Sequence, residues 1–294
     1  MASQADEPTE NPTAVVAVLA AARKRLGNHS PTPRLDAEVL LAHLLDRDRS
    51  WFYAHQDDSL PATTLAQYEQ LLERRVQQVP VAYLTGRQEF WSLEFTVGDS
   101  VLVPRPDTEL LVETGIELVQ DLEAPRILDM GIGSGAVAIA LACELRHADI
   151  TGSDSCSKAL DIATTNANRL QPGRIRLLQS NWFDNLGDEV FDLIVSNPPY
   201  IADDDAHLYN TSIRHEPRMA LVSGLDGLDA IRHICNHAHR HLHPNGALAL
   251  EHGYNQGAAV RSLLHQHGYV AVETRRDTGG NDRVSSGRRS GIVE

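Results

Sequence analysis

The sequence has few of the features that mark secreted or membrane proteins. It contains only three cysteines, Cys143, Cys156 and Cys235, an odd number that argues against a disulfide framework and for a reducing compartment. No apolar run approaches the ~18 residues of a membrane span. The first residues lack the basic start of a secretory signal. We therefore expect a cytoplasmic protein without a membrane segment.

Basic residues are also scarce. The chain has 26 Lys and Arg against 40 Asp and Glu, a formal net charge of −14. Tight nonspecific binding to a phosphate backbone depends on Lys and Arg, so the charge disfavours nucleic acid as a direct partner. Hydrophobic residues (42%) and charged residues (22%) lie in the globular range, which excludes disordered and fibrous classes. A length of 294 residues fits two domains.

The N-terminal part has helical periodicity. Helices are expected over 14–26, 34–45 and 63–78. Thr13 is expected to cap the first, and Gly27 to end it in a left-handed conformation. These helices predict a small domain over 12–82. A connector over 83–104 follows, with strand-like segments at 89–97 and 101–103 joined at residues 98–100 as a β-hairpin.

From residue 105 the pattern alternates between strand and helix. The expected strands are 126–129, 149–154, 176–179, 191–196, 247–251 and 269–273. The expected helices between them are 134–145, 157–170, 228–241 and 256–267. Such alternation predicts an α/β domain over 105–294, with a mostly parallel sheet covered by helices on both faces.

A glycine-rich turn follows the first of these strands. Gly131, Gly133 and Gly135 let the backbone turn tightly and expose N–H groups at a helix N-terminus. Asp154 ends the next strand, where a carboxylate can accept hydrogen bonds from both ribose hydroxyls. The strand, the glycine-rich turn and Asp154 together predict a site for a cofactor that contains a nucleoside. Because Gly131-x-Gly133-x-x-Ala136 also satisfies the dinucleotide pattern, the turn alone leaves NAD open. A tight turn without a ligand is the alternative interpretation.

The tetrapeptide Asn197-Pro198-Pro199-Tyr200 follows the strand 191–196. It is either a rigid loop or a binding segment, and the carboxyl end of a sheet strand favours binding. The prolines hold the segment extended, so that the Asn197 side-chain oxygen and the Pro198 carbonyl can each accept one N–H of a planar NH₂ group. Tyr200 can stack on that plane. Two fixed acceptors would stabilise the charge that develops when such a nitrogen attacks an electrophile.

This combination resembles the methyltransferases that use S-adenosyl-L-methionine to methylate planar nitrogens, either adenine N6 or the glutamine side-chain N5. The Asn-Pro-Pro-Tyr motif is specific to these methyltransferases. Dehydrogenases lack it, which disfavours NAD as the cofactor. The resemblance implies the α/β fold of class I S-adenosylmethionine-dependent methyltransferases, with a Rossmann-like seven-stranded sheet, here preceded by the small helical domain.

Further segments narrow the resemblance. They occur in family order at 80–87, 89–91, 103–109, 181–183, 216–217 and 280–283. From about residue 36 to 288 the chain is similar to the peptide chain release factor N5-glutamine methyltransferases, the PrmC/HemK family. The resemblance implies methylation of the glutamine in the Gly-Gly-Gln motif of class 1 release factors, which would be the protein partners. The helical domain would then recognise this substrate, and we expect a monomer.

The resemblance also assigns the site residues. Residues 131–135 would hold the methionine part of the cofactor, Asp154 its ribose and Trp182 its adenine, although Trp182 can equally be a core residue. The cofactor-binding set is Gly131, Ile132, Gly133, Ser134, Gly135, Asp154, Trp182 and Asn197. The catalytic set is Asn197, Pro198, Pro199 and Tyr200. Residues 105–109 would line the cofactor entrance or cap a helix that starts near Asp107.

Three departures from the family pattern bear on specificity. Met130 and Ile132 stand where Leu and Thr are common, with little expected effect, because the turn works through its backbone. Asn181 replaces a common Asp, so its bond to the adenine amino group should be weaker. His215 replaces a frequent Phe and is reminiscent of a sister family that methylates a ribosomal protein glutamine. That substrate therefore stays open as an alternative.

Two other functional classes were weighed. A DNA or RNA N6-adenine methyltransferase shares the tetrapeptide, but residues 1–104 carry nine basic against fourteen acidic side chains. A non-enzymatic cofactor-binding protein would leave the tetrapeptide unused. No metal is expected. The pair His233 and His237 has no accompanying carboxylate and is predicted to lie on a solvated helix face.

Overall fold

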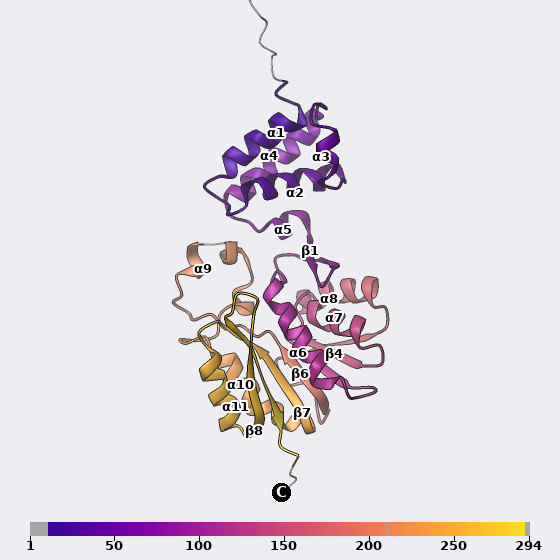
Figure 1. The fold of residues 1–294 in the computed structure, drawn as a ribbon, viewed down its shortest axis with the longest axis vertical. Helices are drawn as coiled ribbons and strands as arrows, with labels where there is room; N and C mark the ends of the chain where they lie inside the picture. Colours follow the sequence, from indigo (N-terminus) through magenta and orange to yellow (C-terminus); the bar gives the residue numbers. More distant parts are fainter. Residues whose placement is uncertain (1–10, 211, 292–294) are drawn as a thin grey trace, which may run out of the picture. The chain divides into compact units, whose positions relative to one another are not determined.

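The computed structural model describes residues 11–210 and 212–291. The chain divides into two compact units, one comprising residues 1–86 with 211–215 and the other residues 87–210 with 216–294 (Figure 1). The N-terminal segment examined for a signal lies outside the described residues. Among those described, no helix is both long enough and apolar enough to cross a bilayer.

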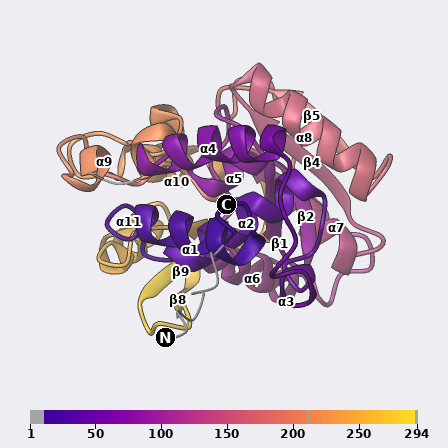
Figure 2. The same cartoon turned by 90° about the horizontal axis from the view of Figure 1, so that it is seen from above.

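The first unit is helical. Its helices are α1 (Val15–Leu26), α2 (Pro33–Leu45), α3 (Trp51–Ala54), α4 (Ala62–Val76) and α5 (Val81–Thr85). Helices α1, α2 and α4 pack against one another, as Figure 2 shows from above. Their shared core includes Leu26, Leu40, Phe52 and Tyr68. The three predicted helices are therefore present. Helices α3 and α5 escaped prediction because segments of four and five residues are too short to show a period.

The predicted ends of α1 differ from those observed. Gly27 has a right-handed φ of −52° rather than a left-handed one, and its N–H donates to the Lys24 carbonyl. Thr13 does not cap the helix: its own N–H and hydroxyl donate to the side-chain oxygen of Asn11, and the N-cap residue is Ala14. The chain leaves α1 through a tight continuation of the helical turn, which needs no left-handed residue.

A two-stranded hairpin opens the second unit. Strands β1 (Arg87–Phe90) and β2 (Leu93–Thr96) pair antiparallel. Trp91 and Ser92 form the turn with φ of 53° and 56°, as a type I′ turn requires. The prediction that residues 98–100 form the turn was wrong, and residues 101–103 are not a strand. Non-glycine residues at positive φ gave no turn signal in the sequence.

The second unit is built on a seven-stranded sheet with the order β5-β4-β3-β6-β7-β9-β8. Its strands are β3 (Arg126–Met130), β4 (Asp149–Asp154), β5 (Ile175–Gln179), β6 (Phe191–Ser196), β7 (Leu242–Glu251), β8 (Tyr269–Arg276) and β9 (Asp282–Arg289). Strands β3 to β7 pair in parallel, and β9 runs antiparallel to both β7 and β8. This confirms the predicted fold class and adds β9, which was not among the predicted strands.

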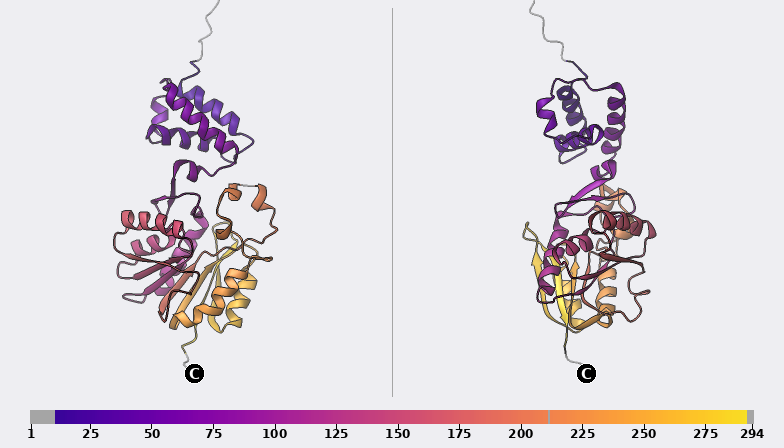
Figure 3. Two further views of the ribbon diagram at one scale, coloured as in Figure 1. Left: turned by 180° about the vertical axis from the view of Figure 1, so that it is seen from behind. Right: turned by 90° about the vertical axis from the view of Figure 1, so that its right-hand side faces the viewer.

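Helices cover both faces of the sheet (Figure 3). They are α6 (Glu109–Val119), α7 (Ala136–Glu144), α8 (Ser157–Leu170), α10 (Asp229–Ala238) and α11 (Gly257–Gln266). The second unit also contains the short α9 (His207–Asn210) and the 3₁₀ turns η1 (Pro106–Thr108), η3 (Arg218–Ala220) and η4 (His239–His241), whereas η2 (Ser212–His215) belongs to the first unit. Leu128 and Leu248 pack with Ile234 of α10 in one core cluster. On the other face, Gly115 of α6 approaches Leu193. Successive side chains of a strand therefore pack against helices on opposite faces of the sheet.

Candidate active site

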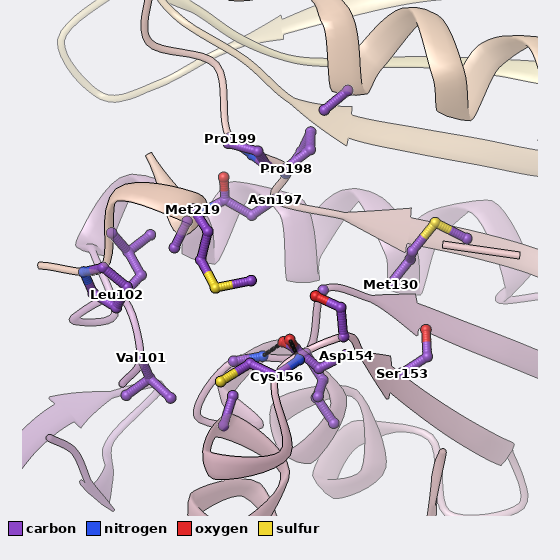
Figure 4. Close-up of a pocket in the computed structure, with 18 of the residues that line it drawn as sticks. Val101, Leu102, Met130, Ser153, Asp154, Cys156, Asn197, Pro198, Pro199 and Met219 are labelled. Atoms are coloured by element: carbon purple, nitrogen blue, oxygen red, sulfur yellow. Dashed lines mark hydrogen bonds between the residues drawn. The ribbon is translucent and has the colours of Figure 1, made fainter. Parts of the chain in front are cut away.

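The strand order reverses between β3 and β6, and the carboxyl ends of such neighbouring strands are where open α/β sheets bind ligands. A cavity of about 550 Å³ lies there, within the second unit. Its walls come from residues after β3, β4 and β6, and from the segments 100–108 and 217–223. In Figure 4, Asn197, Pro198 and Pro199 form one wall and face Asp154 and Cys156, with Met219 reaching between them.

The predicted glycine turn forms part of the cavity wall. Gly131 and Gly133 have φ of 76° and 52°, and a Cβ on Gly131 would meet open space. The Gly131 and Ile132 N–H groups donate to the Ser153 carbonyl at 2.8 and 2.9 Å. Gly131, Ile132, Gly133 and Ser134 line the cavity, whereas Gly135 does not. Gly135, at φ of 86°, is the N-cap residue of α7. The turn therefore lies open to a ligand yet is tied to β4.

Asp154 lies beside that turn. Its Oδ2 accepts the Gly133 N–H at 3.0 Å, and its Oδ1 accepts the Cys156 N–H at 2.9 Å. Each carboxylate oxygen has further lone pairs, and the residue lines the cavity. These two N–H groups hold the carboxylate in one orientation. Its oxygens can then accept further hydrogen bonds from two adjacent hydroxyls.

Asp129 is a cavity residue that the sequence interpretation missed. It is buried in β3, and its Oδ2 accepts the Ala138 N–H at 3.0 Å. Burial raises the pKa of Asp129 to about 7, against the lowering effect of the Ala138 hydrogen bond, and the charge of Asp154 raises it further. An acidic residue two positions before Gly131 was the available signal. It was read only as part of the strand.

Trp182, Asn181 and His233 lie together at another side of the cavity. Trp182 packs against the core cluster and also lines the cavity. It is therefore a core residue in part, and its contact with adenine stays a prediction. Asn181 Nδ2 donates to Asp184 Oδ2 at 3.2 Å, which leaves the Asn181 oxygen available as an acceptor.

The two histidines of α10, His233 and His237, differ in their exposure to solvent. His233 is exposed and His237 is partly buried. The His233 ring lies 6.0 Å from that of Trp182 and 4.3 Å from that of His237. Burial, followed by the neighbouring His237, lowers the pKa of His233. The exposure of His233 agrees with the predicted solvated face, although the same residue also lines the cavity. In the part of the chain that the structure describes, no group of three or more His, Cys, Asp or Glu side chains is arranged to hold a metal.

Asn197 presents an acceptor at the cavity wall. Its Nδ2 donates to Thr108 Oγ1 at 3.2 Å. Its Oδ1 is buried and has no hydrogen-bond partner among the described residues. A buried, unsatisfied oxygen costs free energy unless a ligand donates to it. Pro198 and Pro199 continue the same wall, as the sequence predicted.

Tyr200 points elsewhere. It is absent from the cavity wall, its ring packs against the core cluster, and its hydroxyl donates to Glu251 Oε1 at 3.3 Å. Burial, followed by the charge of Glu251, raises the pKa of Tyr200. Stacking of this ring on a ligand, as the sequence interpretation had it, has no geometric support here. Tyr200 instead secures the end of the tetrapeptide.

The segment 105–109 is divided between two roles. Arg105 and Thr108 line the cavity, and Arg105 pairs with the buried Glu216, which also accepts the Val103 N–H at 3.0 Å. Asp107 pairs with Arg283 at 3.2 Å. Glu109 Oε1, at the end of the segment, accepts the backbone N–H of Trp91 in the hairpin turn at 3.0 Å. Part of the segment therefore serves the cavity, and part holds surrounding elements together.

Two family models match the chain: a PrmC N-terminal domain over residues 17–86 and a methyltransferase small domain over 106–224. The release factor glutamine methyltransferase of Xylella fastidiosa (strain Temecula1) is 46% identical over 277 residues, covering 94% of this chain and 98% of the relative. That of Salmonella typhimurium (strain LT2) is 46% identical over 259 residues, covering 88% and 93%.

Solved structures support the fold. A methyltransferase from Pyrococcus furiosus has a TM-score of 0.50 at 17% identity and covers 78% of this chain and 100% of its own. The hMettl16 catalytic domain has a TM-score of 0.55 at 14% identity, covering 76% and 83%. Identities this low speak for the methyltransferase fold alone. With the two family models and relatives of matching length, the chain belongs to the release factor glutamine methyltransferases.

Proposed function

We propose that this protein transfers the methyl group of S-adenosyl-L-methionine to the side-chain nitrogen N5 of the glutamine in the Gly-Gly-Gln motif of class 1 peptide chain release factors. The supporting observation is the buried, unpartnered Oδ1 of Asn197 at the cavity wall. An oxygen in this state favours a ligand that brings an N–H donor, and a glutamine amide brings two. The printed names of the relatives support the release factor as the protein that carries it.

The residues present fit this cofactor. The left-handed Gly131 and Gly133 leave room for a ligand at the turn, and the fixed carboxylate of Asp154 suits the two ribose hydroxyls. Trp182 offers a ring and Asn181 an acceptor for the adenine. A cavity of about 550 Å³ lies within the range of about 300–1,000 Å³ typical of cofactor sites. When bound, the cofactor supplies an electrophilic methyl group on its sulfonium.

The chemistry required of the protein is mainly positioning. An amide nitrogen is a poor nucleophile because its lone pair is delocalised. Asn197 Oδ1 and the Pro198 carbonyl would accept its two N–H groups and stabilise the positive charge that develops on nitrogen during the transfer. The prolines hold both acceptors on a stiff, extended segment. Aligned reactants of this kind have effective molarities of about 10⁵–10⁸ M.

The direct test is methylation of a release factor. Purified protein, S-adenosyl-L-methionine and unmethylated class 1 factors should yield one methyl group, located by mass spectrometry on the Gly-Gly-Gln glutamine. Asn197→Ala should still bind the cofactor in calorimetry yet lose most turnover. Asn168 is exposed on α8 and does not line the cavity. Asn168→Ala is therefore the matched control and should behave as wild type. Absence of product with both class 1 factors would sink the proposal.

A second glutamine substrate has one observation in its favour. His215 stands before Glu216 where release factor enzymes often have Phe, a pattern reminiscent of the enzymes that methylate a ribosomal protein. Parallel assays with that ribosomal protein and with DNA and RNA complete the comparison. We expect methyl transfer to the release factor to be fastest and none to nucleic acid, because the N-terminal charge balance is acidic. The bacterial relatives support the cytoplasm as the place of reaction.

A further inference from the structure

Asn166 is a buried polar residue of α8 that lies behind the wall of the cavity. It is 0% exposed and does not line the cavity. Its Oδ1 accepts the Thr96 N–H at 2.8 Å, and its Nδ2 donates to the carbonyls of Thr96 and Ser134, each at 2.9 Å. Arg169 Nη2 also donates to Oδ1, at 3.5 Å. The amide therefore uses both of its N–H donors and both lone pairs of its oxygen.

These partners require an asparagine at position 166. The Thr96 N–H needs an acceptor, whereas the carbonyls of Thr96 and Ser134 need donors, and a carboxamide in this orientation supplies both. An aspartate of the same shape would place an oxygen against two carbonyl oxygens, and an apolar residue would leave three buried main-chain groups unpaired. Asparagine is also a poor helix former. Its presence inside α8 is therefore explained by the two segments that it joins and not by the helix itself.

The first of these segments is the glycine turn. Ser134 lines the cavity, while its carbonyl is directed at Asn166. The N–H on the other side of the same peptide plane, that of Gly135, donates to the Ile132 carbonyl at 2.8 Å. Because the peptide bond is planar, these two hydrogen bonds fix its orientation. The turn is thus held from α8 as well as from β4.

The second segment begins where β2 ends, at Thr96. The chain beyond it forms a different wall of the cavity, lined by Ser100, Val101 and Leu102. Because both the N–H and the carbonyl of Thr96 bond the Asn166 amide, this side chain pairs with the end of β2 as a neighbouring strand would. A single amide therefore joins two cavity walls that are distant in the sequence.

We propose that Asn166 is a positioning residue that holds the glycine turn and the segment after β2 together as one cofactor site. This inference rests on the proposed function, because these walls enclose the site assigned to S-adenosyl-L-methionine. Without the amide the two walls can separate, and the apparent affinity falls with the fraction of molecules in which both are in place. The hydrogen bonds of Asn166 include none to the tetrapeptide, so the loss should fall on the cofactor and spare the transfer step.

The kinetic test uses the isosteric variant Asn166→Asp at saturating release factor. The KM and the calorimetric Kd for S-adenosyl-L-methionine should each rise about tenfold, which corresponds to the loss of about one net hydrogen bond between the walls. At saturating cofactor, kcat should stay close to that of wild type, which is the pattern of a lost ground-state interaction. A wild-type KM in folded Asn166→Asp, or a loss confined to kcat, would overturn the inference.

Two controls separate this role from a general loss of stability. Leu264 of α11 is buried in the core cluster and does not line the cavity. Leu264→Ala should lower the midpoint of thermal unfolding by leaving a void, yet keep the wild-type KM. Arg169→Ala removes the longest of the four bonds and a bond to the Glu94 carbonyl, so it should also keep the cofactor affinity. An equal rise of KM in Leu264→Ala would show that instability alone accounts for the effect.

Hydrogen exchange followed by mass spectrometry gives a readout without turnover. In wild type, saturation with S-adenosyl-L-methionine should slow exchange in the glycine turn and also in β2, which does not line the cavity. In Asn166→Asp the protection of β2 should be lost, and both segments should exchange faster than in wild type when no cofactor is present.

The two proposals fail in different ways. If Asn166→Asp does not fold, the wild-type exchange decides, and protection of the turn without protection of β2 overturns the inference. If wild type binds no S-adenosyl-L-methionine, the proposed function fails. The exchange of the two cofactor-free proteins then still tests the connection, and equal rates in the turn and in β2 would overturn it.

Discussion

A glycine from a different segment, Gly227, leaves room for the carbonyl of Tyr200, and this close approach can be tested by one substitution. Gly227 has a φ of +74°, and a Cβ on it would lie 2.2 Å from the Tyr200 oxygen and 2.9 Å from the Gln256 amide nitrogen. Gln256 Nε2 donates to that same oxygen at 3.0 Å. Real Cβ contacts essentially never fall below 3.0 Å, so in Gly227→Ala residue 227 and the Tyr200 carbonyl must separate by about 0.8 Å or more, and we expect the tetrapeptide to be displaced.

The expected losses follow from these distances. An alanine at positive φ costs about 1–2 kcal/mol, and a strained Gln256 hydrogen bond adds about 1 kcal/mol. A displacement near 1 Å at a positioning segment costs about 10²-fold in rate. We therefore expect Gly227→Ala to lose about 2–3 kcal/mol of unfolding free energy and about 10²-fold in kcat, with little change in cofactor affinity.

Gly173 provides a matched control. Its φ of +72° is nearly the same, yet a Cβ there would meet nothing within 4 Å. Gly173→Ala should lose only the backbone term of about 1–2 kcal/mol and keep wild-type kcat. Urea unfolding and steady-state methylation of both variants separate conformational strain from displacement of the tetrapeptide. Equal stability losses in the two variants, together with a wild-type kcat for Gly227→Ala, would refute the reasoning.

Substitutions at three further sites have defined outcomes. The folded-state pKa of Asp129 is raised to about 7, so its contribution to stability is present at low pH and lost as pH rises through 7. Asp129→Asn should flatten that fall, which amounts to at most about 1.4 kcal/mol per pH unit, in urea unfolding between pH 5 and 8. In the helical unit, Asp36 and Arg75 are 5% and 7% exposed and pair at 2.7 Å. Asp36→Ala should cost about 3–5 kcal/mol by leaving a buried cation unpaired, and Asp36→Leu with Arg75→Met should cost less. Thermal unfolding would show the opposite order if the pair were unimportant. Trp182→Ala should weaken S-adenosyl-L-methionine binding about 10-fold, from lost stacking of about 1–3 kcal/mol, whereas Trp182→Phe should retain most affinity in calorimetry; an unchanged affinity in Trp182→Ala would make this residue a core residue alone.

The fold was predictable wherever apolar runs are continuous. The strand 191–196, Phe-Asp-Leu-Ile-Val-Ser, has the predicted bounds because a central parallel strand is buried on both faces and therefore carries an apolar run. Strand β9 was missed because its Asp-Arg-Val-Ser-Ser-Gly-Arg-Arg sequence has little apolar character. Its buried serines owe their environment to the strands on either side, which no local pattern reports.

The site was predictable where a motif is local and unpredictable where it is assembled. Asn197 could be singled out from its own tetrapeptide. Its partner Thr108 is 89 residues away, and Glu251 is 51 residues from Tyr200, so only the folded sheet joins them. Tyr200 was assigned to the ligand because an aromatic ring beside an acceptor suggests stacking. Its hydroxyl instead donates to a buried carboxylate, as buried phenols generally do with an available acceptor.

The bonds between the glycine turn and β4 have a consequence for the thermodynamics of cofactor binding. Main-chain bonds to Ser153 and the side chain of Asp154 already fix the turn in the free protein. Little backbone entropy then remains to be lost when a cofactor binds, so more of its contact free energy is available as affinity. A substitution at Asp154 accordingly removes two things together, an acceptor for the ribose and the tether that keeps the turn ordered.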